Sequence, residues 1–265
     1  MSGQPFALLL LLVSPLVSEQ SASEEALVAG QALRWSMRGL APFEKEAARL
    51  KAVRCFRVGV FAPGSAESRS QCALRSGELL NAGGLRETAG RDLMVGVGLA
   101  AGEWSARCAL IVGELFLAEG RGAEALLVLS GVAHSRAPTK LIERAAVLTG
   151  GAFDSLGEEA IAVKLWRSVA EDGVTPSHRF DAFERWGQRL LELGDLEGAA
   201  GVLSRCRFTL EEIALELTAT GRAIRELLSQ SSLARSIHRA VTLRHRKSLR
   251  TRSGQLSNSP SDGEL

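Results

Sequence analysis

Residues 113–129 decide the fold: Gly-Glu-Leu-Phe-Leu-Ala-Glu-Gly-Arg-Gly-Ala-Glu-Ala-Leu-Leu-Val-Leu. Their order of small, bulky, glycine, alanine and bulky residues returns in residues 150–166 and again in residues 187–203. The central glycine recurs every 37 residues, at Gly83, Gly120, Gly157 and Gly194. A period of this length indicates a helical repeat, in which each unit buries its apolar face against the next unit.

Each position of the pattern has a physical role in a pair of antiparallel helices. The small residue lets a second helix approach closely, and the bulky residue before the central glycine fills the space between helices. The glycine accepts a left-handed backbone at a helix end, and the alanine marks a second close crossing. The residues in these positions are Gly113, Phe116, Ala125 and Leu129; Gly150, Phe153, Ala162 and Trp166; and Gly187, Leu190, Ala199 and Leu203.

The pattern resembles the tetratricopeptide repeat over about residues 70–210, although that family usually has a period of about 34 residues. We expect the extra residues between units, where Pro138 and Pro176 interrupt helices. In the unit built on Gly83, Ser76 and Thr88 replace the small residue and the alanine, so this unit is predicted to be degenerate. The alternative is a helical bundle without repeats, which is disfavoured because several positions agree across three units.

The resemblance implies an all-α fold, an α-solenoid of stacked antiparallel helix pairs. Composition agrees, because Tyr is absent, β-branched residues are sparse, and the good helix formers Ala, Leu, Glu and Arg dominate. The repeats are assigned to residues 69–208. The flanking segments are predicted to be a signal peptide (1–23), a helical N-terminal extension (24–68), C-terminal capping helices with a basic stretch (209–252) and a disordered tail (253–265).

The signal peptide is predicted from an apolar run at residues 6–17. A membrane-spanning helix needs about 20 apolar residues, so this run fits the shorter core of a secretory signal. Ala22 and Ser23 are small residues that suit a cleavage zone, although no Lys or Arg precedes the run. An uncleaved anchor and a buried helix are the alternatives. We expect a periplasmic, cell-envelope or secreted protein.

The resemblance also implies a binding site for another protein or peptide, because the first helix of each pair lines a concave groove in that family. Carrying the family's positions over gives Arg107, Leu110 and Glu114; Arg144, Val147 and Asp154; and Asp181, Glu184, Gln188 and Glu192. The alternative is that these residues form only the solvated face of each helix. The family's clamp for a peptide carboxylate is missing, since the matching positions hold Ala73, Gly77, Leu110 and Glu114.

Catalysis is not expected, because the sequence lacks a nucleophile elbow, a zinc-protease motif and a phosphate-binding loop. No cofactor and no metal site are predicted. The four cysteines, Cys55, Cys72, Cys108 and Cys206, are interpreted as small buried residues, with disulfides as the alternative. The four tryptophans, Trp35, Trp104, Trp166 and Trp186, are assigned to the core.

The competing hypothesis is a cytoplasmic nucleic-acid-binding regulator. Residues 209–228 have the apolar spacing of a helix-turn-helix, and seven Lys or Arg residues follow between Arg235 and Arg252. The same spacing describes a pair of capping helices, which we favour, and export would exclude DNA. The sequence therefore predicts a non-catalytic interaction scaffold or adaptor of the cell envelope. Nucleic acid is an unlikely partner, and a membrane is expected only through the signal segment or the basic stretch.

Overall fold

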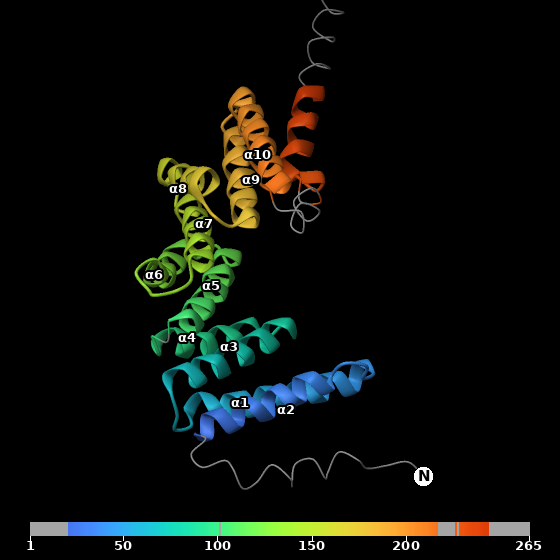
Figure 1. Cartoon of the computed structure of the whole chain (residues 1–265), viewed down its shortest axis with the longest axis vertical. Helices are drawn as coiled ribbons and strands as arrows, with labels where there is room; N and C mark the ends of the chain where they lie inside the picture. The colour runs from blue at the N-terminus through green and yellow to red at the C-terminus, as the bar shows by residue number, and fades with distance from the viewer. Residues whose placement is uncertain (1–20, 101, 217–225, 227, 244–265) are drawn as a thin grey trace, which may run out of the picture. The chain divides into compact units, whose positions relative to one another are not determined.

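Figure 1 shows the computed structural model, which describes residues 21–100, 102–216, 226 and 228–243. All regular secondary structure in these residues is α-helical. Two compact units divide the chain at Leu141, and each is described by itself. Within each unit, consecutive helices pack against one another as antiparallel neighbours. The predicted class, an all-α solenoid built from helix pairs, is therefore confirmed.

The first unit contains six complete helices: α1 (Ala22–Ser36), α2 (Pro42–Phe61), α3 (Ala66–Ala82), α4 (Arg86–Gly98), α5 (Glu103–Ala118) and α6 (Gly122–Ala133). Each helix packs on the next, and α3 also contacts α1 and α5. The predicted N-terminal extension is thus a helix pair that stacks on α3 as the later pairs do. The packing of each helix on the next therefore begins before residue 69, the predicted start of the repeats.

Helix α1 begins inside the segment predicted to be a signal peptide. Ser21 is its N-cap, and the fully buried Ser23 hydroxyl lies 2.6 Å from that of Ser68. A cut at Ala22 or Ser23 would remove this cap and a buried contact. Ser21 and Ser23 therefore contribute to the fold of the first unit, although both lie in the segment predicted to be a signal peptide.

The second unit contains most of α7 (Thr139–Ser155), then α8 (Glu159–Asp172), α9 (Pro176–Glu192), α10 (Leu196–Glu216) and a last helix at residues 232–243. Helix α9 packs against both α8 and α10. Pro176 occupies the first turn of α9, and α7 starts directly after Pro138, as the sequence predicts. Helix α10 extends past residue 208, the predicted end of the repeats.

The turns of the four helix pairs from α3–α4 to α9–α10 share one geometry. The residue after the central glycine donates its backbone N–H to the bulky residue five positions earlier, as from Arg121 to Phe116 at 2.8 Å. The same bond joins Leu85 to Leu80, so the central glycine of that unit is Gly84, with φ +79°. The prediction based on Gly83 was one residue out of frame, and Gly77 and Ala89 supply the positions that were thought degenerate.

The small residue of each pair faces the bulky residue 16 positions later. A Cβ atom at Gly113 would lie 2.8 Å from Leu129, and Cβ atoms at Gly77 and Gly150 would overlap Leu93 and Trp166. The last pair differs, because a Cβ atom at Gly187 would overlap Leu233 of helix 232–243 instead of Leu203. The last helix therefore packs directly on α9.

Two cysteines, Cys72 and Cys108, fill close crossings between helices. A Cβ atom at Gly59 would lie 2.5 Å from the Cys72 sulfur, and one at Gly96 would lie 2.6 Å from the Cys108 sulfur. Burial raises the pKa of the Cys72, Cys108 and Cys206 thiols to about 12, so they remain protonated at neutral pH. All four cysteines are free thiols, although Cys55 is only half-buried. The interpretation as small buried residues holds for the other three.

Candidate functional site

A polar concavity of the second unit, the unit 2 groove, has a volume of about 640 Å³. Side chains of α7 and α9 supply most of its lining, and Trp166 and Phe180 contribute buried aromatic surface. Its charged and polar lining residues are Arg144, Asp154, Asp181, Glu184, Arg185, Gln188, Arg189, Glu192, Gln230 and Ser232. The groove therefore combines both signs of charge with apolar surface.

Ion pairs connect the two helices that line the groove. Arg144 of α7 donates to the Asp181 carboxylate of α9 at 2.6 Å. Arg189 of α9 lies 3.2 Å from Asp154 of α7 and 2.8 Å from Glu192, and it also pairs with Glu159. The arginines of α7 and α9 thus hold neighbouring carboxylates in place.

Asp154 lies in a partly buried position that disfavours its ionised form. Burial raises its pKa, and the facing Arg189 guanidinium only partly offsets that effect. Its Oδ1 atom and Arg189 Nε are buried and lack a hydrogen bond in the structure, although they lie 3.2 Å apart. This pair is therefore held by charge more than by hydrogen-bond geometry.

Glu184 determines where the last helix begins. Its carboxylate accepts hydrogen bonds from the backbone N–H groups of Ser232 at 2.9 Å and Leu233 at 3.0 Å, and from the hydroxyls of Ser231 and Ser232. A carboxylate at this place satisfies free N–H groups and favours the positive end of the helix dipole. Glu184 thereby anchors helix 232–243 at the edge of the groove.

Glu143 of α7 accepts hydrogen bonds from the backbone directly before α9. It accepts backbone hydrogen bonds from Val174 at 2.5 Å and Thr175 at 3.1 Å, and its carboxylate lies 3.5 Å from the His178 ring. Burial acts to raise the Glu143 pKa, but the hydrogen bonds from Thr175 and Val174, together with the nearby His178 ring, outweigh it and lower the pKa. The ionised carboxylate is therefore the form that the fold stabilises.

The structure brings six of the seven predicted residues of this unit to the groove: Arg144, Asp154, Asp181, Glu184, Gln188 and Glu192. Val147 is fully buried in the core, so it does not face the groove. It occupies a position that the repeat family uses for binding, but here the neighbouring Trp166 donates to its backbone carbonyl at 3.0 Å. Sequence reasoning missed Arg189, which pairs with carboxylates of three helices, α7, α8 and α9.

The three residues predicted in the first unit do not form one surface. Leu110 is buried, Glu114 is exposed, and Arg107 pairs with Glu103 at 2.5 Å. The Arg107 guanidinium also lies 5.3 Å from the centre of the Trp104 ring. Leu110 is thus a packing residue and does not belong to a binding surface with Arg107 and Glu114.

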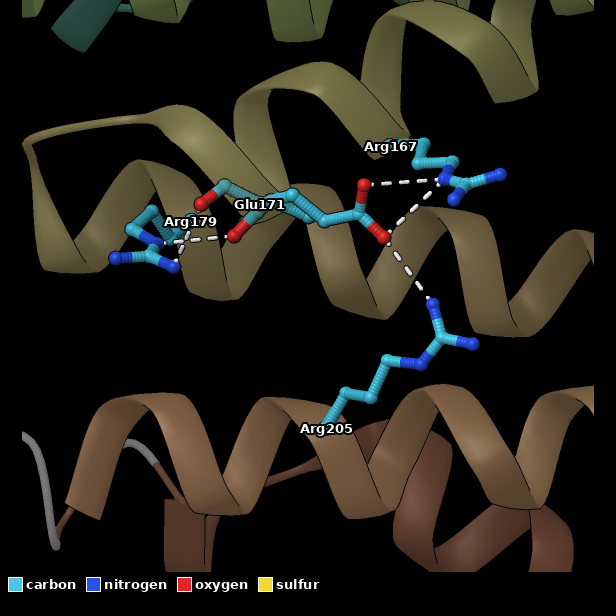
Figure 2. Close-up of polar contacts among 5 residues, drawn as sticks. Arg167, Glu171, Arg179 and Arg205 are labelled. Atoms are coloured by element: carbon cyan, nitrogen blue, oxygen red, sulfur yellow. Dashed lines mark hydrogen bonds and ion pairs between the residues drawn. The ribbon is translucent and has the colours of Figure 1, made fainter. Parts of the chain in front are cut away.

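A second cluster of arginines surrounds Glu171 on α8. Figure 2 shows the Glu171 carboxylate between Arg167 of α8 and Arg205 of α10, at 3.1 Å from each. Both guanidinium groups lie 5.8 Å from the Trp186 ring centre. Arg179 of α9 instead donates to the backbone carbonyls of Ala170 and Glu171 at 2.9 Å, which caps the end of α8. These contacts join α8, α9 and α10, so we assign the cluster a structural role.

The described residues contain no group of three or more His, Cys, Asp or Glu side chains placed to hold a metal ion. None of the described helices combines the length and apolar character needed to cross a bilayer. Residues 209–216 of the proposed helix-turn-helix continue α10, while 217–225 and 227 lie outside the described residues. The predicted signal and tail also lie outside them, except Ser21–Ser23.

Because the comparisons with known proteins found no match, a function has to be argued from the geometry of the structure. No protein-family model matches the chain, and no curated protein matches it.

Proposed function

We propose that the protein is a non-catalytic interaction scaffold that binds another protein or peptide in the unit 2 groove. The observation that carries the proposal is the lining of this groove by the first helices of two successive pairs, α7 and α9. Arg144, Asp181 and Gln188 supply donors and acceptors on these helices, and Trp166 and Phe180 supply apolar surface. Preformed grooves of this composition bind through a few buried anchors surrounded by polar contacts.

The resemblance to the tetratricopeptide repeat supports this proposal. The pairs built on Gly84, Gly120, Gly157 and Gly194 repeat the turn geometry that the sequence pattern predicts. Solenoid repeats commonly use one continuous helical face for binding. We therefore also propose that the chain is a tetratricopeptide-like repeat protein. A separate part of the proposal is that the protein is located in the cell envelope.

Site-specific photocrosslinking in cells tests the groove. A crosslinking amino acid at Gln188 lies in the groove, and the same group at the exposed Lys164 of α8 is the matched control. We expect discrete adducts from position 188 that weaken in the Asp181→Arg background, whose fold is checked by circular dichroism. Equal adducts from positions 188 and 164 would contradict binding in this groove.

The alternative function, nucleic-acid binding, keeps support only from the spacing of residues 209–228 and the basic residues after Arg235. Anisotropy of labelled double-stranded DNA over a salt series distinguishes the two functions. Tight binding that weakens steeply with salt would favour the regulator.

N-terminal sequencing of the protein from fractionated cells tests the location. The export proposal expects a mature start near Ser21 in an exported fraction, because α1 needs Ser21 and Ser23. An intact Met1 in the cytosol would contradict export.

A further inference from the structure

A second concavity, on the first unit, has a different chemistry. The arginine pocket has a volume of about 420 Å³ and is lined by Gln31, Arg34 and Trp35 of α1, by Arg38 of the turn after α1 and by Arg75 of α3. Trp35 was predicted to lie in the core, but 63% of its surface is exposed. An exposed tryptophan beside three arginines needs an explanation other than packing.

One carboxylate partly neutralises the pocket. Glu78 of α3 lies 3.2 Å from Arg34 and 2.9 Å from Arg75, so it fixes these two guanidinium groups next to each other. Arg38 lies 3.9 Å from the centre of the Trp35 ring. Within the described part of the chain, Arg38 has no carboxylate partner. Three positive charges against one negative charge leave a formal excess of two.

The excess charge is arranged in two positions. Glu78 fixes one, at Arg34 and Arg75, and the Trp35 ring fixes the other, at Arg38. Arg34 lies in the last turn of α1, and Arg38 follows the helix end at Ser36, so the two guanidinium groups come from the helix and from the turn after it. Side chains two residues apart on one face of an extended peptide are separated by about 7 Å. An acidic residue, any residue, acidic residue sequence places two carboxylates on one face of an extended peptide, so such a peptide can present one carboxylate to each position.

We propose that the arginine pocket binds an extended acidic peptide of a partner protein through two carboxylates two residues apart. Arg34 and Arg75 bind one carboxylate, Arg38 binds the other, and the exposed Trp35 face packs against the residue between them. A planar guanidinium donates two parallel hydrogen bonds to a carboxylate, which fixes its orientation. The pocket is separate from the unit 2 groove, so this proposal does not depend on the groove being a binding site.

The surroundings favour a short peptide over a nucleic acid. The adjoining concavity shares Arg34 and Arg38 and contains Lys45, but its Arg49 is already bound to Glu46 at 2.8 Å and to the Leu79 carbonyl at 2.7 Å. Nucleic acids bind through many successive phosphate contacts, which require a continuous basic track. The excess charge in the arginine pocket is local.

Fluorescence polarisation with the full chain tests the proposal. The probe is labelled Gly-Ala-Glu-Ala-Glu-Ala-Gly, and the controls replace both Glu by Gln or place the two Glu side by side. We expect the first probe to bind best, and its affinity to fall with added salt. Arg38→Gln should weaken binding by about tenfold, as expected for loss of a charged hydrogen-bonding pair. Arg91→Gln, an exposed arginine of α4 paired with Glu87, should leave it unchanged.

Several outcomes would overturn the proposal. An equal loss of peptide affinity in Arg38→Gln and Arg91→Gln would show that binding depends only on the overall charge of the protein. Equal binding of the Glu and Gln peptides would remove the role of the carboxylates. Tighter binding of a peptide with one phosphoserine, or of single-stranded DNA, would assign the pocket to phosphate. Circular dichroism of Arg38→Gln checks the fold, which this exposed residue should not affect.

Discussion

The two units use their arginines in opposite ways. In the second unit, Arg144 and Arg189 are bound to carboxylates that line the same groove or its edge, so the charges hold α7 and α9 together. In the first unit, Arg38 rests on an exposed tryptophan and keeps its hydrogen-bond donors free of carboxylate partners among the described residues. Paired charges stabilise a surface, whereas unpaired charges leave it ready for a ligand of opposite sign.

The units also differ in the side chains that fill their helix crossings. Leu93 and Leu129 face the small residues of the first unit, while Trp166 does so in the second. Trp166 is fixed further by its hydrogen bond to the Val147 carbonyl. A leucine tip can move by rotation, but a hydrogen-bonded indole cannot move without breaking its bond. The crossing at Gly150 should therefore be less tolerant of changes than the crossings at Gly77 and Gly113.

The largest expected effect tests this difference in packing. Gly150→Ala places a methyl group on the Trp166 ring, and overpacking of this kind destabilises a core by about 1–3 kcal/mol. Gly113→Ala meets the end of Leu129 and should cost less. Denaturant unfolding measures both, with Gly131→Ala as the control, because a Cβ atom there meets nothing within 4 Å. Equal costs at positions 150 and 113 would contradict the proposed stiffness of the crossing at Gly150.

An intermediate effect is expected at the N-terminus of α9. Glu143→Gln removes a buried charge that accepts hydrogen bonds from Val174 and Thr175, and it should cost about 1–2 kcal/mol at neutral pH. The fold lowers the Glu143 pKa, so its contribution is complete above the unfolded value of about 4.3. The contribution is lost as the pH falls through the lower folded pKa. The difference in unfolding free energy between the two proteins should therefore be larger at pH 7 than at pH 3.

The smallest effect compares single arginines of the two units. Arg189→Ala leaves Asp154, Glu159 and Glu192 without their shared cation, so the thermal midpoint should fall, though less than in Gly150→Ala. Arg38→Ala removes only the contact with the Trp35 ring and should leave the midpoint unchanged. Differential scanning fluorimetry measures both midpoints. A larger fall in Arg38→Ala would show that the arginine pocket is a structural feature.

Periodicity predicted the helix pairs because the pattern is local. The central turn depends on residues within about nine positions of one another, and Gly120, Gly157 and Gly194 mark it directly. The first repeat was misread because Gly83 and Gly84 are adjacent. Only the backbone, with its left-handed φ at Gly84 and the bond from Leu85 to Leu80, distinguishes them.

The groove was predicted in part, since its residues recur at repeat positions on α7 and α9. The misplaced residues, Leu110 and Val147, are apolar, and packing rather than position buries them. Conversely, Trp35 is a large apolar residue, yet 63% of its surface is exposed.

The sequence by itself determined the helical class and the chain positions of the turns, because each depends on neighbouring residues. Tertiary structure decided which distant side chains meet. Arg75 joins Arg34 and Arg38 only after α3 packs on α1, and Leu233 reaches Gly187 only because Glu184 anchors the last helix. Such contacts depend on how helices stack, which no local spacing encodes.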